Sequence, residues 1–181
     1  MKKNLKEIGR YIRAVRKKRG LKMTDLADEN ISTSTISNIE NGFEAVNDEK
    51  RIYLCEKLNL NYHQIPRLIE EEKEKKNGTL QTLEYIEKVI DLGNHREGLK
   101  RLRRVDLDSS YLKAVGYYLR GRAYIVRDRD DDKERAKRYF FEAVERIDQS
   151  SDGIKDVMNI KASCYNQIAQ ICYYANDLEG A

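Results

Sequence analysis

The sequence predicts an all-α protein, on three observations. Apolar residues recur every three or four positions over most of the chain, the alternation typical of strands is scarce, and the only proline is Pro66. With 181 residues the chain has room for one or two domains, and 40% hydrophobic residues are enough for a packed core. The net charge is only +4, so the distribution of charge says more about function than its total.

Five short helices are expected in the first 69 residues. The first ends at Gly20, after three cations that suit a helix C-terminus, and the fifth begins near Tyr62. The apolar positions that define them, in order, are Leu5, Ile8, Ile12 and Val15; Leu21, Leu26 and Ala27; Ile36 and Ile39; Ile52, Leu54, Cys55 and Leu58; and Ile65, Leu68 and Ile69.

Residues 32–42 predict an amphipathic helix with an uncharged outer face. Ser32 can accept hydrogen bonds from the first turn, and Gly42 can take the left-handed conformation that ends a helix. Ile36 and Ile39 mark the buried side. The opposite side carries small, neutral, polar residues, namely Thr33, Ser34, Ser37, Asn38 and Asn41. In a chain with 36% charged residues, such a face suits contact with base edges, which are read by their hydrogen-bond pattern.

The run from Ile36 to Gly42, Ile-Ser-Asn-Ile-Glu-Asn-Gly, resembles the recognition helix of the Cro/phage-repressor (XRE-like) helix-turn-helix class. The resemblance covers roughly residues 8–69. It implies that bases are read by Thr33, Ser34 and Asn38. It implies that phosphate or the groove edge is met by Ser32, Thr35 and Asn41. It also implies an ion pair between Arg16 and Glu40, which would tie the first helix to the recognition helix.

Cations dominate the N-terminal end of the chain. Ten of the first 22 residues are Lys or Arg, against the single acidic Glu7. Such an end favours a phosphate-bearing partner, with a solvated helix face as the alternative. The phosphate candidates are Lys3, Lys6, Arg13, Lys17 and Lys22.

Two residues depart from the pattern of the class. Lys22 stands where a serine cap is common, and Met23 stands where a polar residue usually touches the DNA backbone. Lys22 can still reach phosphate, but Met23 cannot donate a hydrogen bond. The first residue of the second helix is therefore not expected to bind phosphate through its side chain.

Residues 70–78 are charged and lack apolar side chains, which predicts a linker or an exposed helix extension. We therefore expect a helix-turn-helix domain over 1–69, the charged segment over 70–78, and a second domain over 79–181.

The second domain shows a repeating pattern of small and aromatic residues. Its three units carry Val89, Gly98, Leu102 and Val105; Tyr117, Gly121, Tyr124, Ala136, Phe140 and Ala143; and Tyr165, Ala169, Cys172 and Ala181. The pattern resembles the tetratricopeptide repeat, a solenoid of antiparallel helix pairs, with a generic helical bundle as the alternative. Because the third unit stops within its second helix, we expect a fragment of a longer protein, or a partner that covers this end.

No cofactor, metal site or enzymatic activity is expected. His63 and His95 are lone. The acidic run with Asp128, Asp130 and Asp132 lacks the glycine of a calcium loop, so we expect it to be the exposed loop between two repeat helices. The three cysteines, Cys55, Cys164 and Cys172, are read as buried thiols in a reducing cytoplasm. No apolar run reaches the roughly 20 residues that span a bilayer, so no membrane partner is expected.

These features predict a sequence-specific DNA-binding transcriptional regulator that acts in the cytoplasm as a homodimer, joined through the repeats or the linker. The architecture also resembles that of the peptide-pheromone-responsive regulators of Gram-positive bacteria. That resemblance implies that a short signalling peptide binds the repeat domain. The alternative is a protein-interaction adaptor whose helix-turn-helix no longer reads DNA, because small polar residues make weaker base contacts than Arg or Gln.

Overall fold

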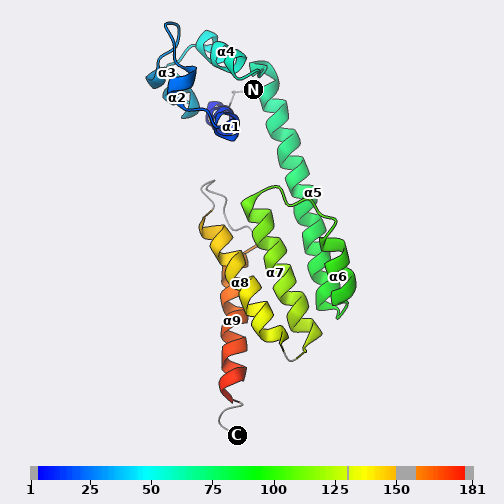
Figure 1. Cartoon of the computed structure of the whole chain (residues 1–181). Coiled ribbons are helices and arrows are strands. Elements are labelled where there is room, and N and C mark those ends of the chain that lie inside the picture. Colours follow the sequence, from blue (N-terminus) through cyan, green and yellow to red (C-terminus); the bar gives the residue numbers. More distant parts are fainter. Residues whose placement is uncertain (1–3, 130, 150–157, 178–181) are drawn as a thin grey trace. The chain divides into compact units, whose positions relative to one another are not determined.

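The computed structural model describes residues 4–129, 131–149 and 158–177. This part of the chain is helical and contains no strand, so the predicted all-α class is confirmed (Figure 1). The chain divides into two compact units, Met1–Lys76 and Asn77–Ala181. The elements in order are α1 (Leu5–Lys18), α2 (Met23–Leu26), α3 (Thr33–Glu40), α4 (Asp48–Lys57), the short 3-10 helix η1 (Tyr62–Gln64), α5 (Ile65–Asp91), α6 (His95–Leu102), α7 (Ser110–Arg127), α8 (Asp132–Asp148) and α9 (Ile160–Asp177).

The core of the first unit is built from the apolar positions that the sequence pattern marks. Ile12, Ile36 and Leu54, from α1, α3 and α4, are fully buried. Cys55 is buried beside them, and this burial raises the pKa of its thiol to about 12. The thiol therefore stays protonated and acts as a small hydrophobic side chain.

Local signals set the ends of these helices. The Asn4, Ser32 and Asn47 side chains each accept a hydrogen bond from a first-turn amide of α1, α3 and α4, respectively. Gly42 follows α3 with φ +74°, as predicted for a left-handed stop. A Cβ at Gly42 would lie 2.7 Å from the Cα of Lys6, so the position requires glycine for space as well as for conformation.

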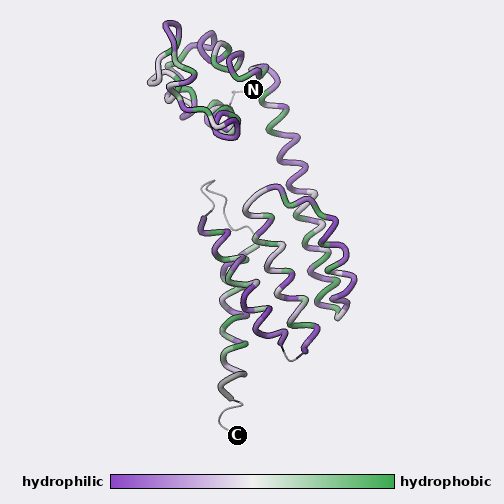
Figure 2. Tube along the Cα trace, viewed as in Figure 1, coloured by the Kyte–Doolittle hydropathy of each residue, from purple (hydrophilic) through white to green (hydrophobic). Residues whose placement is uncertain are grey.

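Residues 70–78, expected to be a linker or a helix extension, lie within α5. The middle of this helix is hydrophilic (Figure 2). Salt bridges with i,i+3 or i,i+4 spacing, such as Arg67–Glu71 and Lys73–Glu70, stabilise the first turns of the helix on its exposed surface.

In the second unit, helices close on one another at glycines. A Cβ on Gly98 would lie 2.4 Å from the side chain of Ile90, and one on Gly121 would lie 2.5 Å from the ring of Phe140. The Tyr118 hydroxyl donates to Glu87 Oε1 at 2.9 Å, which connects α7 to α5. Helices α7 and α8 form a tightly packed hairpin with Ala136, Phe140 and Ala143 in its core.

Two expectations from the sequence are wrong in this unit. Cys172, expected to be buried, is exposed, because it follows Ile171, the last residue of α9 that packs into the described core. Asp132, expected in an exposed loop, is buried and paired with Arg127, with Nε 2.7 Å from Oδ2. The expectations for Lys3, Asp130 and Ala181 fall outside the described residues.

Candidate nucleic-acid interface

Helix α3 presents its uncharged side to solvent. Ile36 and Ile39 are buried against the core of the first unit, and Ile31 anchors the chain just before the helix. Thr33, Ser34 and Asn38 are exposed, which places all three predicted base-reading side chains on the outer surface. Because these side chains are short, their reach is set by the position of the helix itself.

The hydroxyls at the start of α3 form a local cluster around Ser32. Its Oγ accepts from the Thr35 amide at 3.2 Å and lies 2.8 Å from Ser34 Oγ and 2.9 Å from Thr35 Oγ1. Thr33 and Asn38, by contrast, make no side-chain hydrogen bond with a described residue. The donors and acceptors of Thr33 and Asn38 are thus available to another molecule.

The structure brings Arg16 and Glu40 together. Arg16 Nε lies 2.5 Å from Glu40 Oε1 and Nη2 lies 2.9 Å from Oε2, a bidentate pair in which both residues are buried. A third donor, Nη1, bonds the carbonyl of Leu21 at 2.7 Å. The hydrogen bond to Glu40 is the main cause of the raised pKa of Arg16, with burial opposing it. One side chain of α1 therefore fixes the end of α3 and the turn into α2.

Gly9 permits the close approach of α1 to α3. A Cβ at this position would lie 2.4 Å from the Ile39 carbonyl oxygen and 2.6 Å from that of Glu40. Sequence reasoning missed this residue. The available signal was its spacing from Ile12 and Arg16, which puts a glycine on the buried face of an amphipathic helix.

Asp28 fixes the turn between α2 and α3, and it too was missed. Its Oδ1 accepts from the amides of Asn30 and Ile31, at 2.9 and 3.0 Å. Its Oδ2 accepts from the Tyr53 hydroxyl at 2.7 Å and pairs with Lys57, both on α4. These donors, Lys57 first, hold the pKa of Asp28 well below its usual value. The Asp-x-Asn spacing of an Asx turn was the signal in the sequence.

Arg51 of α4 holds the loop that follows α3. Arg51 is buried, and its Nη2 donates to the carbonyl of Phe43 at 2.8 Å while its Nη1 pairs with Asp48 at 2.7 Å. The Phe43 amide donates to the Asn38 carbonyl. Both the carbonyl and the amide of Phe43 are therefore hydrogen-bonded, which fixes the backbone just after α3.

The predicted phosphate contacts lie on the surface of the same unit. Lys6, Arg13, Lys17 and Lys22 are exposed, as are Ser32 and Asn41, while Thr35 is half-buried. Arg13 Nε lies 4.0 Å from Glu40 Oε2, so this cation is held beside the end of α3. Lys22 stands at the N-cap of α2, and its amide, not its side chain, donates to Asp25 at 2.8 Å.

Met23 is half-buried and packs against the core of the first unit. At the first residue of α2, where a polar side chain in this class usually touches the DNA backbone, Met23 instead packs into the protein core. The side chain that precedes it, Lys22, remains exposed.

Residues 12–61 match a helix-turn-helix family model. The matched segment contains α2, α3 and α4 and the last part of α1. The family is a DNA-binding regulatory domain and not an enzyme family, so the match supports a DNA-binding regulator. No curated protein and no solved structure matches the chain.

The described residues show neither a metal site nor a membrane span. No group of three or more of their His, Cys, Asp or Glu side chains is placed to hold a metal ion. None of their helices combines the length and the apolar character that a membrane span needs.

Proposed function

We propose that this chain is a sequence-specific transcriptional regulator that inserts α3 into the major groove of DNA. The observation that carries the proposal is the exposed, neutral face of α3 on a helix fixed by the buried Arg16–Glu40 pair. Thr33, Ser34 and Asn38 offer both donors and acceptors to base edges. A fixed helix matters because a short side chain cannot compensate for a misplaced backbone.

Phosphate contacts would orient α3 in the groove. The exposed Lys17 and Lys22 are the cations we assign to this role together with Arg13, and Ser32, Thr35 and Asn41 supply neutral donors. Modules of this kind read two half-sites about 34 Å apart, so we propose that the chain acts as a homodimer.

We further propose that the second unit senses a short signalling peptide. The helix pairs α5–α6 and α7–α8 close at Gly98 and Gly121, which supports a tetratricopeptide-like stack of helix hairpins. Such stacks offer extended surfaces to peptides. Peptide binding would then change the geometry of the dimer and hence its affinity for DNA.

The test is selection of duplexes from a random DNA pool, followed by binding of the selected duplex over a salt series. A regulator retains a defined sequence, and its affinity falls steeply with salt. Exchanging Lys17 and Lys22 for Gln should reduce the slope of log K against log salt by about 1 for each phosphate that is no longer neutralised. The matched control exchanges two exposed lysines of the second unit, Lys113→Gln with Lys133→Gln.

The adaptor is the second candidate, and α9 is the observation that favours it. Tyr165, Tyr173 and Tyr174 are exposed on this helix, as expected for a surface that packs against another protein. Absence of duplex retention even at low salt would reject the regulator and favour the adaptor.

A further inference from the structure

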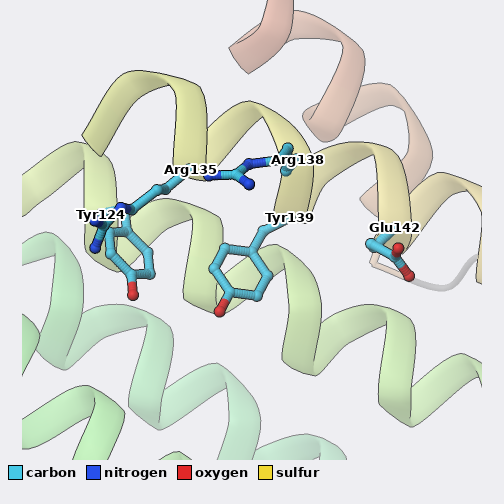
Figure 3. Close-up of a pocket in the computed structure, with 5 residues that line it drawn as sticks. All are labelled: Tyr124, Arg135, Arg138, Tyr139 and Glu142. Atoms are coloured by element: carbon cyan, nitrogen blue, oxygen red, sulfur yellow. The ribbon is translucent and has the colours of Figure 1, made fainter. Parts of the chain in front are cut away.

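The hairpin of α7 and α8 carries a pocket of about 400 Å³. Tyr124 from α7 and four residues of α8, namely Arg135, Arg138, Tyr139 and Glu142, line it (Figure 3). It contains two guanidinium groups, two phenol groups and a single carboxylate, so its chemistry favours an anion.

Among the described residues, no carboxylate lies within salt-bridge distance of the two arginines of the pocket. Neither Arg135 nor Arg138 makes an ion pair with a described residue, although Glu142 lines the same pocket. Their neighbour Arg127, in contrast, is paired directly with the buried Asp132, on whose carboxylate Arg135 acts only through its charge and without a hydrogen bond. Guanidinium groups outside a salt bridge keep planar, paired N–H donors that fit a carboxylate in a bidentate manner.

The tyrosine rings around the pocket are already covered. Tyr124 and Tyr139 stack with their centroids 5.4 Å apart, and the Arg127 guanidinium lies over the Tyr124 ring at 4.5 Å. Arg120 and Arg146 lie over the nearby Tyr117 ring, at 5.4 and 5.8 Å. Nucleic-acid single strands bind such surfaces by stacking bases on free rings, and here stacking and cations occupy the rings.

We propose that this pocket binds an acidic peptide and that Arg135 and Arg138 hold one of its carboxylates. The hydroxyls of Tyr124 and Tyr139 can donate to the same group or to peptide carbonyls, and Glu142 can accept from a peptide N–H. Glu142 also disfavours a phosphate chain, which has no donors to offer it. The proposal deepens the peptide control described above, and its regulatory meaning rests on that proposed function.

The experiment measures fluorescence anisotropy of labelled hexaglutamate with the full chain, with hexaglutamine and oligothymidylate as comparison probes. The N-terminal cations also attract an anion, so the decisive comparison is between two double variants of equal charge. Arg135→Gln with Arg138→Gln removes the guanidinium groups of the pocket. Arg103→Gln with Arg104→Gln removes two exposed arginines that follow α6.

Hexaglutamate should bind at least about tenfold more weakly to the pocket variant, because two charge-assisted hydrogen bonds are removed. The control variant should stay within roughly twofold of the unmodified chain, because Arg103 and Arg104 do not line the pocket. Equal weakening of the two variants, or no saturable binding of hexaglutamate, would overturn the proposal. A pocket-dependent preference for oligothymidylate would assign the site to phosphate instead. Duplex binding is measured separately, so a failure of DNA recognition does not change this result.

Discussion

Helices α3 and α9 both expose uncharged surfaces in a highly charged chain, yet the two surfaces differ in chemistry. On α3 the exposed groups are the short hydroxyls and amide of Thr33, Ser34 and Asn38. On α9 they include aromatic rings beside amides such as that of Asn166; Tyr165 is 49% exposed and Tyr173 is 66% exposed. The absence of charge marks a surface suited to a partner, and the remaining groups indicate which kind.

The two helices also differ in the interactions that hold them in place. Helix α3 is fixed by the buried Arg16–Glu40 pair at its end and by the Asp28 network before its start. The start of α9 is held by a hydrogen bond from the Met158 amide to the Tyr111 hydroxyl, at 3.0 Å. A fixed helix of short polar side chains suits the reading of base edges, whereas aromatic side chains suit an apolar interface.

The largest effect is expected from breaking the anchor of α3. Glu40→Ala leaves the buried Arg16 guanidinium without its carboxylate and should cost about 3–5 kcal/mol of unfolding free energy in the first unit. Urea denaturation followed by hydrogen exchange in α1 and α3 measures this loss. Glu97→Ala removes an exposed pair with Arg101 and should cost less than about 1 kcal/mol. Equal costs for the two variants would mean that α3 is not held more firmly than a surface helix.

The limits of sequence reasoning follow from the range of each interaction. The start and end of α3 could be predicted because Ser32 and Gly42 act on their own neighbouring residues. The pairing of Arg16 with Glu40 came only from the family resemblance, since 24 positions separate the two residues. Gly9 was missed because its role depends on how closely another helix approaches.

The same reasoning explains the errors in the second unit. The apolar spacing around Cys172 marks one side of α9, but spacing cannot tell whether another element covers that side. In the sequence, Asp132 is part of an acidic run that is typical of an exposed loop. Its burial depends on the ion pair with Arg127, which forms only in the folded structure. The pocket of α7 and α8 was not predicted because its arginines and tyrosines come together only when the hairpin closes.

A second prediction tests the close approach that positions α3. Gly9→Ala places a methyl group against two backbone carbonyls, which cannot rotate away, and should cost about 1–3 kcal/mol of stability. Gly78→Ala is the matched control, because a Cβ there meets nothing within 4 Å and the position lies inside α5. In a helix interior this exchange should stabilise by about 0.5–1 kcal/mol. Opposite signs in urea denaturation support the packing of α1 on α3, and matching signs contradict it.

A third prediction compares an asparagine from each neutral surface. Asn38→Ala should cost about 1–3 kcal/mol of affinity for a selected duplex and relax the preference at one base pair. Asn166→Ala changes an asparagine of α9 that is also exposed, and it should leave duplex affinity unchanged. Competition binding against duplexes substituted at each position measures both effects. A loss for Asn38→Ala that is the same for every DNA sequence would make Asn38 a backbone contact.

The smallest effect is expected on the exposed side of α9. Tyr173→Ser removes a ring that is 66% exposed, so the unfolding free energy of the isolated chain should change by less than about 0.5 kcal/mol. Tyr111→Phe, which deletes the hydroxyl that holds Met158, is the contrast and should cost about 1 kcal/mol. Both are measured by urea denaturation at several protein concentrations. A large loss of unfolding free energy in Tyr173→Ser that grows with protein concentration would show that α9 is already covered in an oligomer. Helices α3 and α9 would then differ only in the kind of partner that they bind.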